Sequence, residues 1–263
     1  MVGEMPAASN RSELILQELL RHGEVWVDSL ARRFKVSAST IRRDLSDLER
    51  QGLLRRSHGG ARPVTPMLYE PFRHLSSFRE QEKRCEAEKR RIGLAAASLI
   101  SDGEVIAVGA GTTTTQLARC IRHRKGIAIV TNAVNIAMEL SHLPEIEVSM
   151  TGGSLSGDWF ALVGDVAQRN VGEMFFDKAF IGVDGAHAEH GLRTNYPDQA
   201  AIHRAMMRQA RQRIIVADHR KIGAFGRSLI WPTADIDKLI TDKSTAEEAV
   251  APFVAKGVVV LRA

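Results

Sequence analysis

The chain has 263 residues, of which 44% are hydrophobic and 25% charged, so it can form two globular domains and is unlike a disordered protein. No apolar run reaches the roughly 18–20 residues that a membrane span needs, and the N-terminus lacks the apolar segment of a secretory signal. The only cysteines, Cys85 and Cys120, form neither a disulfide framework nor a CxxC zinc motif, so we expect a cytoplasmic protein without a metal or other cofactor.

Positive charge is concentrated near the N-terminus. Residues 30–62 contain nine Lys or Arg and three acidic side chains, a surplus larger than the +5 of the whole chain. Such a stretch favours a polyanionic partner, and DNA is the commonest one. A solvated basic face is the alternative.

The first sixty residues predict three short helices and a hairpin. Apolar spacing favours helices over 11–21, 28–34 and 37–51, with Gly23 and Gly52 as stops and Ser37 as an N-terminal cap. Residues 53–60 then read as a short β-hairpin. Three helices with a tight turn before the third, followed by a hairpin, describe a winged helix-turn-helix.

The third helix carries the candidate DNA contacts. Small and hydroxyl residues at its start allow close approach to a groove and can donate hydrogen bonds to phosphates, while arginines one turn later can fork onto a guanine edge or a phosphate. Asp44 beside them is expected to orient an arginine or to tie the helix to a neighbour. The candidates in this helix are Ser37, Ala38, Ser39, Thr40, Arg42 and Arg43.

Residues 63–88 change in character. Pro63, Pro66 and Pro71 interrupt regular structure, and the charged stretch 79–91 then favours a helix, either solvated or in a dimer contact. We therefore expect a DNA-binding domain over 1–62, a linker with a charged helix over 63–88, and an α/β domain over 89–263.

The second domain alternates apolar strands with helices. Strands are expected at 105–108, 127–130, 146–150, 178–183, 213–218, 239–241 and 258–261, and helices near 116–122, 134–140 and 200–212. This alternation predicts a largely parallel sheet, whose ligands bind beyond the carboxyl ends of the strands.

The loop 109–115, GAGTTTT, is the most distinctive feature of this domain. Glycines expose backbone amides, threonines add hydroxyl donors, and a following helix start adds its dipole, which together can hold a phosphate. The loop lacks the ending of a P-loop and the spacing of the dinucleotide fingerprint, so a nucleotide is not indicated.

These motifs together resemble the DeoR-type transcription regulators over nearly the whole chain. VDSLARRFKVSASTIRRDLSDLERQGLLRRSHGGA is similar to their DNA-binding segment, and GAGTTTT, TNA, TGG, FIGVDG and ADHRKIG occur in the order of their effector domain. The resemblance implies a fold similar to ribose 5-phosphate isomerase and the CoA transferases. It also implies DNA contacts by the wing near Arg56 and His58, and a ligand site formed by Gly111, Thr112, Thr113, Thr114, Thr131, Asn132, Gly153, Asp184 and Lys221.

Some positions depart from the pattern of that family. Gly109 stands where Asp is frequent, Gln199 where Glu is usual and His203 where Lys is usual. Trp26 stands in place of a hydroxyl cap; either Asp28 supplies the cap or Trp26 packs on the first helix. Asp198 or His203 could substitute at the sugar end of the site, or the ligand could be a polyol phosphate or a phosphorylated acid. The simpler expectation for His203 is a histidine on a helix surface.

The resemblance implies a repressor of a carbohydrate or polyol operon, with an activator as the alternative. Because a single small winged domain grips DNA weakly, we expect a homo-oligomer, dimer or tetramer. A phosphorylated sugar or polyol would control its binding to a double-stranded DNA operator. The alternatives are an isomerase-like enzyme with a DNA-binding domain and an architectural DNA binder. Isomerisation needs a carboxylate base, and no glutamate occurs between His190 and Arg213, so we expect no catalysis.

Overall fold

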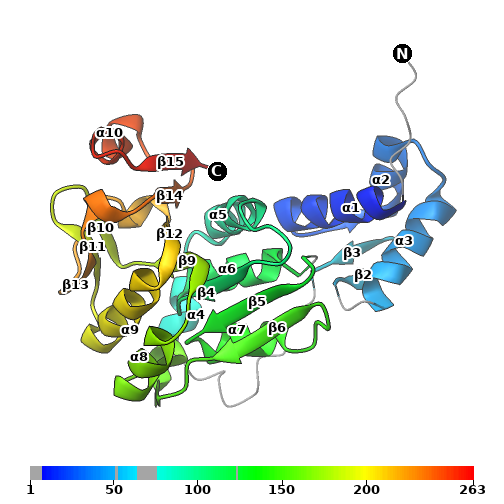
Figure 1. The fold of residues 1–263 in the computed structure, drawn as a ribbon. Helices are drawn as coiled ribbons and strands as arrows, with labels where there is room; N and C mark the ends of the chain where they lie inside the picture. The colour runs from blue at the N-terminus through cyan, green and yellow to red at the C-terminus, as the bar shows by residue number, and fades with distance from the viewer. Residues whose placement is uncertain (1–7, 51–52, 64–75, 123) are drawn as a thin grey trace. The chain divides into compact units, whose positions relative to one another are not determined.

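A computed structural model describes residues 8–50, 53–63, 76–122 and 124–263 of the chain (Figure 1). The chain divides into two compact units, residues 1–67 and 68–263. None of the helices in the described ranges is long and apolar enough to span a membrane.

The first unit is a winged helix-turn-helix. Its elements are α1 (Ala8–His22), β1 (Val25–Trp26), α2 (Val27–Phe34), α3 (Ala38–Arg50), β2 (Arg55–Ser57) and β3 (Gly60–Arg62). The three strands form an antiparallel sheet in the order β1-β3-β2. The hairpin begins and ends two residues later than predicted, and its pairing with β1 was not foreseen, because a two-residue strand has no periodicity to detect.

The start of α2 depends on this third strand. Trp26 occupies the cap position without a side-chain hydrogen bond, and the N–H of Val27 donates to the carbonyl of Gly59 at 2.8 Å. A side chain at position 60 would overlap the carbonyl oxygen of Val25, so only glycine lets the two strands lie this close. The wing therefore replaces the hydroxyl or Asp28 cap considered from the sequence.

An ion pair joins the outer helices of this unit. Arg11 of α1 donates from Nε and Nη2 to the carboxylate of Asp44 on α3, at 2.6 and 2.9 Å. Both side chains are about nine-tenths buried, beside a core that includes Ile15, Ile41 and Leu45. Asp44 thus ties the third helix to the first, one of its two predicted roles.

The second unit is built on a seven-stranded parallel sheet with the order β15-β14-β12-β9-β4-β5-β6. Its strands are β4 (Val105–Val108), β5 (Ile127–Thr131), β6 (Ile146–Met150), β9 (Phe176–Gly182), β12 (Ala210–Val216), β14 (Lys238–Thr241) and β15 (Val259–Arg262). This confirms the predicted, mostly parallel α/β class.

Smaller elements flank this sheet. Two antiparallel groups were not predicted: β7 (Ser154–Ser156) with β8 (Ala161–Val163), and β10 (Gly185–His187), β11 (Gly191–Thr194) and β13 (Ser228–Trp231). The helices are α4 (Ser76–Lys83), α5 (Glu86–Ser98), α6 (Thr112–Cys120), α7 (Val134–Leu140), α8 (Asp165–Gly172), α9 (Pro197–Arg208) and α10 (Glu247–Ala255), and the short 3-10 turns are η2 (Gly157–Trp159), η3 (His219–Lys221) and η4 (Thr233–Asp235).

Helix boundaries in the second unit differ from the prediction. Helix α6 begins four residues earlier than expected, so the threonines belong to its first turn. Helix α9 ends at Arg208 because residues from Ala210 onward pair with β9 in the sheet. The charged stretch forms two helices instead of one, since Cys85 has a left-handed backbone with φ of 53°.

Lys89 stabilises the corner between α4 and α5. Its side chain is 1% exposed, and its ammonium donates to the carbonyl of Gln81 near the C-terminus of α4. Cations favour this end of a helix, where carbonyls lack intrahelical partners. Burial lowers the pKa of Lys89 to about 8.

We predict that Asp44→Ala destabilises the winged helix-turn-helix by about 3 kcal/mol, because it leaves the guanidinium of Arg11 buried without its carboxylate. Thermal and urea denaturation would measure this loss. Asp47→Ala is the matched control, since its pair with Arg50 is exposed and worth at most about 1 kcal/mol. Equal losses in the two variants would contradict a structural role for the Arg11–Asp44 pair.

Candidate functional site

Helix α3 presents two arginines to solvent. Ile41, Leu45 and Leu48 face the core, whereas Arg42 and Arg43 lie on the exposed side. Neither guanidinium has an ion-pair or hydrogen-bond partner within the described part of the chain, unlike most arginines of the second unit. This helix face therefore offers free cationic donors to a polyanion.

The start of α3 is ordered by its own hydroxyls. Ser37 Oγ accepts from the backbone N–H of Thr40 at 3.2 Å, which confirms the predicted cap, and it also contacts the hydroxyls of Ser39 and Thr40 at 2.8 Å. Ser37 and Ser39 are exposed, while Ala38 and Thr40 are half-buried. The first turn is thus accessible and already fixed in position.

The wing supplies the remaining predicted DNA contacts. Arg56 and His58 are both exposed. The backbone N–H of Arg56 donates to Glu49 of α3 at 2.9 Å, so helix and wing are joined. The half-exposed ring of Trp26 lies against Gly59 in the wing turn.

A pocket with about 500 Å³ of space, part of it open to solvent, lies in the second unit. It is placed by three neighbouring parallel strands: β4 leads into Gly111, β9 into Asp184, and β12 into Asp218 and Lys221. Its lining comprises Gln81, Ala110, Gly111, Thr112, Thr113, Trp159, Gly182, Val183, Asp184, Thr194, Tyr196, Gln199, Asp218 and Lys221. Five of the nine predicted ligand residues therefore meet at one site.

The N-terminus of α6 forms one wall of the pocket. Thr112 and Thr113 stand in its first turn, where backbone N–H groups have no intrahelical acceptor and the helix dipole is positive. Thr114 and Thr115 turn inward, and their hydroxyls donate to the carbonyl of Gly111 at 2.9 and 2.8 Å. Thr114 therefore fixes the loop and does not line the pocket.

Three other predicted residues lie outside the pocket lining. Asn132 accepts from the N–H of Ala110 at 2.8 Å and donates to the carbonyl of Leu162 at 3.1 Å, while Thr131 donates to the carbonyl of Val108 at 2.7 Å. Gly153 has φ of +102° in the turn before β7. These residues hold the loops in position.

Opposite charges are paired inside the pocket. Lys221 Nζ lies 3.4 Å from Asp184, whose other oxygen accepts from Thr194 Oγ1 at 3.0 Å and from the N–H of Asn195 at 2.8 Å. Asp218 is fully buried and bonded by the guanidinium of Arg220 at 3.0 and 3.2 Å. Each carboxylate of the lining is thus paired with a cation, Asp184 with Lys221 in the lining and Asp218 with Arg220 outside it.

Sequence reasoning missed a wall formed by Gln81, Trp159 and Tyr196. Trp159 contacts Tyr196 at 5.5 Å between ring centroids and Phe78 of α4 at 6.2 Å. The available signal was compositional, because the chain has only three Trp and two Tyr. Trp159 and Tyr196 lie far from α4 along the sequence, so local sequence patterns do not predict that they form one wall with Gln81 of this helix.

His203 is not on the helix surface, so that expectation was wrong. It is 1% exposed, and neither ring nitrogen has a hydrogen-bond partner among the described residues. Burial lowers its pKa to about 4, although the carboxylate of Asp184 acts in the opposite direction. Asp198, the other suggested substitute, is exposed and does not line the pocket.

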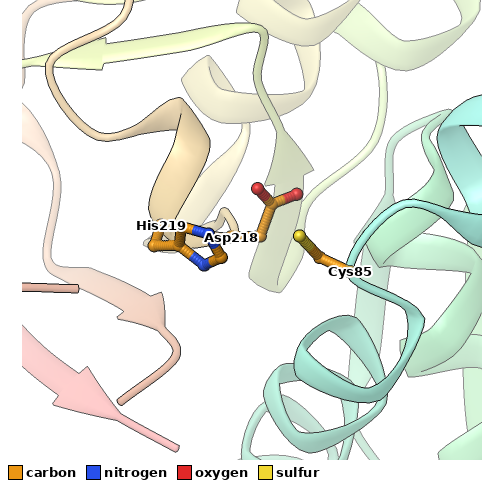
Figure 2. Close-up of side chains that lie close together, drawn as sticks. All are labelled: Cys85, Asp218 and His219. Carbon is orange, nitrogen blue, oxygen red and sulfur yellow. The ribbon is translucent and has the colours of Figure 1, made fainter. Parts of the chain in front are cut away.

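Beside the pocket, Cys85, Asp218 and His219 place possible metal-ligand atoms within 4.8 Å of one another (Figure 2). Asp218 is already bound by Arg220, and His219 Nδ1 lies 3.1 Å from Asp242. A metal cation would have to displace the guanidinium from a carboxylate. We interpret this cluster as the support of η3, which carries Lys221 into the pocket.

We predict that lowering the pH from 7 to 5 destabilises the second unit by about 2 kcal/mol through His203. The unfolded chain takes up this proton near pH 6.5, but the folded chain does so only near pH 4, so acid favours unfolding. Urea denaturation at several pH values should show this slope in wild type and not in His203→Gln. His190→Gln, at an exposed position of the same unit, is the control; the same slope in all three proteins would contradict a buried neutral imidazole.

Two protein-family models match the chain. The DeoR-like helix-turn-helix domain covers residues 11–66, and the DeoR C terminal sensor domain covers residues 84–243. Among solved structures, the full-length sorbitol operon regulator SorC from Klebsiella pneumoniae is 12% identical, with a TM-score of 0.36 over 82% of this chain and 90% of that one. A D-ribose-5-phosphate isomerase is 20% identical, with a TM-score of 0.38 over 52% of this chain and 53% of that one.

Curated relatives extend over most of the chain. The HTH-type transcriptional repressor GlcR of Bacillus subtilis is 33% identical, covering 87% of this chain and 86% of that protein. The HTH-type transcriptional regulator GlpR of Haloferax volcanii is 34% identical, covering 89% and 90%. The HTH-type transcriptional repressor CsqR of Escherichia coli is 30% identical, covering 88% and 87%. With both domains matched and the helix-turn-helix and strand-end pocket in place, this chain belongs to the DeoR family of DNA-binding transcription regulators.

Proposed function

We propose that the chain is a transcriptional repressor of a carbohydrate or polyol catabolic operon, and that a phosphorylated sugar or polyol in the pocket controls its binding to operator DNA. The carrying observation is the convergence of Gly111, Thr112, Thr113, Asp184 and Lys221 on one pocket. Two relatives, GlcR and CsqR, are named as repressors, which supports repression over activation of transcription.

The phosphate end of the ligand would lie at the start of α6. Free backbone N–H groups and the helix dipole attract an anion there, and the ammonium of Lys221 adds a compact positive charge. Thr114 and Asn132 keep this loop in shape. The hydroxylated end would face Gln81, Tyr196, Gln199 and Trp159, whose buried indole N–H has no partner in the described structure.

DNA would be held by Arg42, Arg43, Arg56, His58 and the start of α3 at Ser37–Thr40. A single small winged domain grips DNA weakly, so we expect a cytoplasmic homo-dimer or tetramer to bind repeated half-sites. An isomerase-like enzyme is disfavoured because the pocket carboxylates that the structure describes, Asp184 and Asp218, are both ion-paired and hydrogen-bonded instead of free to take a proton.

Helix α4 is suited to link the pocket to the DNA-binding domain. It follows the connecting segment 64–75 in sequence, and it contributes Gln81 to the pocket. Phe78, 2% exposed, packs edge-on against Phe160 at 5.0 Å and against Trp159, while Glu82 binds Arg119 of α6 at 2.8 Å. A ligand that moves Trp159 or Gln81 would therefore act on α4, and we expect this helix to couple ligand binding and DNA binding reciprocally.

We predict separate effects for the two sites. Arg43→Ala should weaken operator binding about tenfold, since one guanidinium contact contributes about 1–3 kcal/mol, and should leave ligand binding intact. Lys221→Ala should weaken ligand binding and leave operator binding intact. Fluorescence anisotropy measures DNA binding, and a thermal-shift panel of sugar and polyol phosphates, each beside its unphosphorylated parent, measures the ligand.

Arg208→Ala is the control for both variants, because it removes an exposed positive charge from the second unit. Loss of both activities in a folded Arg43→Ala or Lys221→Ala protein would contradict this division. A panel without any phosphate-dependent shift would contradict the sensor function.

We predict that Phe78→Leu reduces the coupling between ligand and DNA with little change in either affinity measured alone. The smaller side chain loosens the contact of α4 with Trp159 and Phe160 while keeping the core apolar. Operator titrations with and without the ligand found in the panel give the coupling factor. Phe175→Leu, at a 59% exposed position, is the control; unchanged coupling in Phe78→Leu would remove α4 from the pathway.

A further inference from the structure

Behind the pocket lining, α9 makes a close contact with the loop after β4. Gln199 lines the pocket and is 7% exposed, and His203 lies one helical turn further along the same face of α9. A Cβ atom at position 109 would be 2.9 Å from His203 Nε2 and 2.9 Å from Ile181 Cδ1. The imidazole and any side chain at position 109 therefore compete for one space.

This part of the wall carries no charge. Gly109 has no side chain, Gln199 is a neutral amide, and the buried imidazole stays uncharged at neutral pH because burial lowers its pKa to about 4. Both imidazole nitrogens lack partners in the described protein, so no carboxylate is bonded to them that would draw a proton onto the ring.

The charged side chains of the lining cannot serve a second ionised group on the ligand. Lys221, which is paired with Asp184, is already assigned to the phosphate of the ligand, and Asp218 is paired with Arg220. A second carboxylate or ammonium group on the ligand, placed near Gln199, would lose its hydration and would meet no opposite charge in the pocket. Leaving such a group unpaired in a buried site costs more than a neutral hydroxyl does.

We propose that His203, with Gly109 and Gln199, sets the specificity of the pocket for an effector whose only ionised group is its phosphate, a neutral polyol or sugar monophosphate. His203 is a positioning residue here: it occupies the space beside Gly109 and keeps the wall under Gln199 uncharged. The proposal rests on the proposed sensor function and excludes a phosphorylated acid, one of the ligands that the sequence left open.

The contact itself can be tested without any ligand. Gly109→Ala should lower the melting temperature in the wild-type background, because the added methyl group meets the imidazole. The same change should cost less in His203→Ala, where the ring has been removed and, of the two contacts at 2.9 Å, only the one with Ile181 Cδ1 remains. Additive losses in this double-mutant cycle would contradict the contact.

Specificity is tested with two matched probes, glucitol 6-phosphate and 6-phosphogluconate, which differ only in a hydroxymethyl group replaced by a carboxylate. By calorimetry, wild type should bind the polyol phosphate at least about tenfold more tightly, since the second carboxylate would be unpaired. His203→Lys and Gln199→Lys should shift this ratio towards the acid, whereas His203→Gln should keep it. Gln199→Glu should shift the affinity ratio further towards the polyol phosphate. This variant provides the test if a lysine variant fails to fold.

Equal affinity of wild type for the two probes would overturn the proposal, as would a ratio that none of the charged variants changes. A polyol phosphate that binds no more tightly than inorganic phosphate would also overturn it. A stability measurement with inorganic phosphate distinguishes failure of the specificity proposal from failure of the sensor function. If it stabilises wild type and not Lys221→Ala, the phosphate site stands even when the specificity proposal falls.

Discussion

Parallel pairing of β4, β9 and β12 is the constraint on which the sensor pocket depends. Neighbouring parallel strands end at the same edge of a sheet, so the segments that follow them are brought together although they begin at residues 109, 183 and 217. Each segment adds a different element: a helix start with free N–H groups, a carboxylate at Asp184, and a 3-10 turn carrying Lys221. No one segment forms the pocket by itself.

The loops at this edge are held by hydrogen bonds from residues outside the pocket. Asn132 uses its amide to bridge the loop after β4 to Leu162, and Thr131 closes on Val108. Asp218 is buried and fixes η3 by accepting from Arg220. Such support keeps polar groups in place before a ligand arrives, which lowers the entropy lost on binding.

Arginines are used differently in the two units. On α3, Arg42 and Arg43 stay exposed and without partners in the described chain, as suits contact with a polyanion. In the second unit, Arg119 binds both Glu82 and Glu139, and Arg122 binds Glu139, so that positive charge holds helices together. Arg11 of the first unit serves the same structural purpose with Asp44. Positive charge near the N-terminus is therefore available to a polyanion where it stays exposed, and it holds helices together where it is buried.

The sequence by itself determined the helix-turn-helix and the parallel α/β class, because periodicity and caps are local patterns. Five of the pocket residues were predicted through the resemblance to the DeoR family, and the glycine-rich strand end at 109–115 agreed with it. Tertiary structure alone decided the rest. It turned Thr114, Thr131 and Asn132 inward as loop supports, brought Gln81 and Trp159 to one wall, and buried His203 beside Gly109. These outcomes depend on packing between segments distant in sequence, and local propensity contains no information about which side chains such packing brings together.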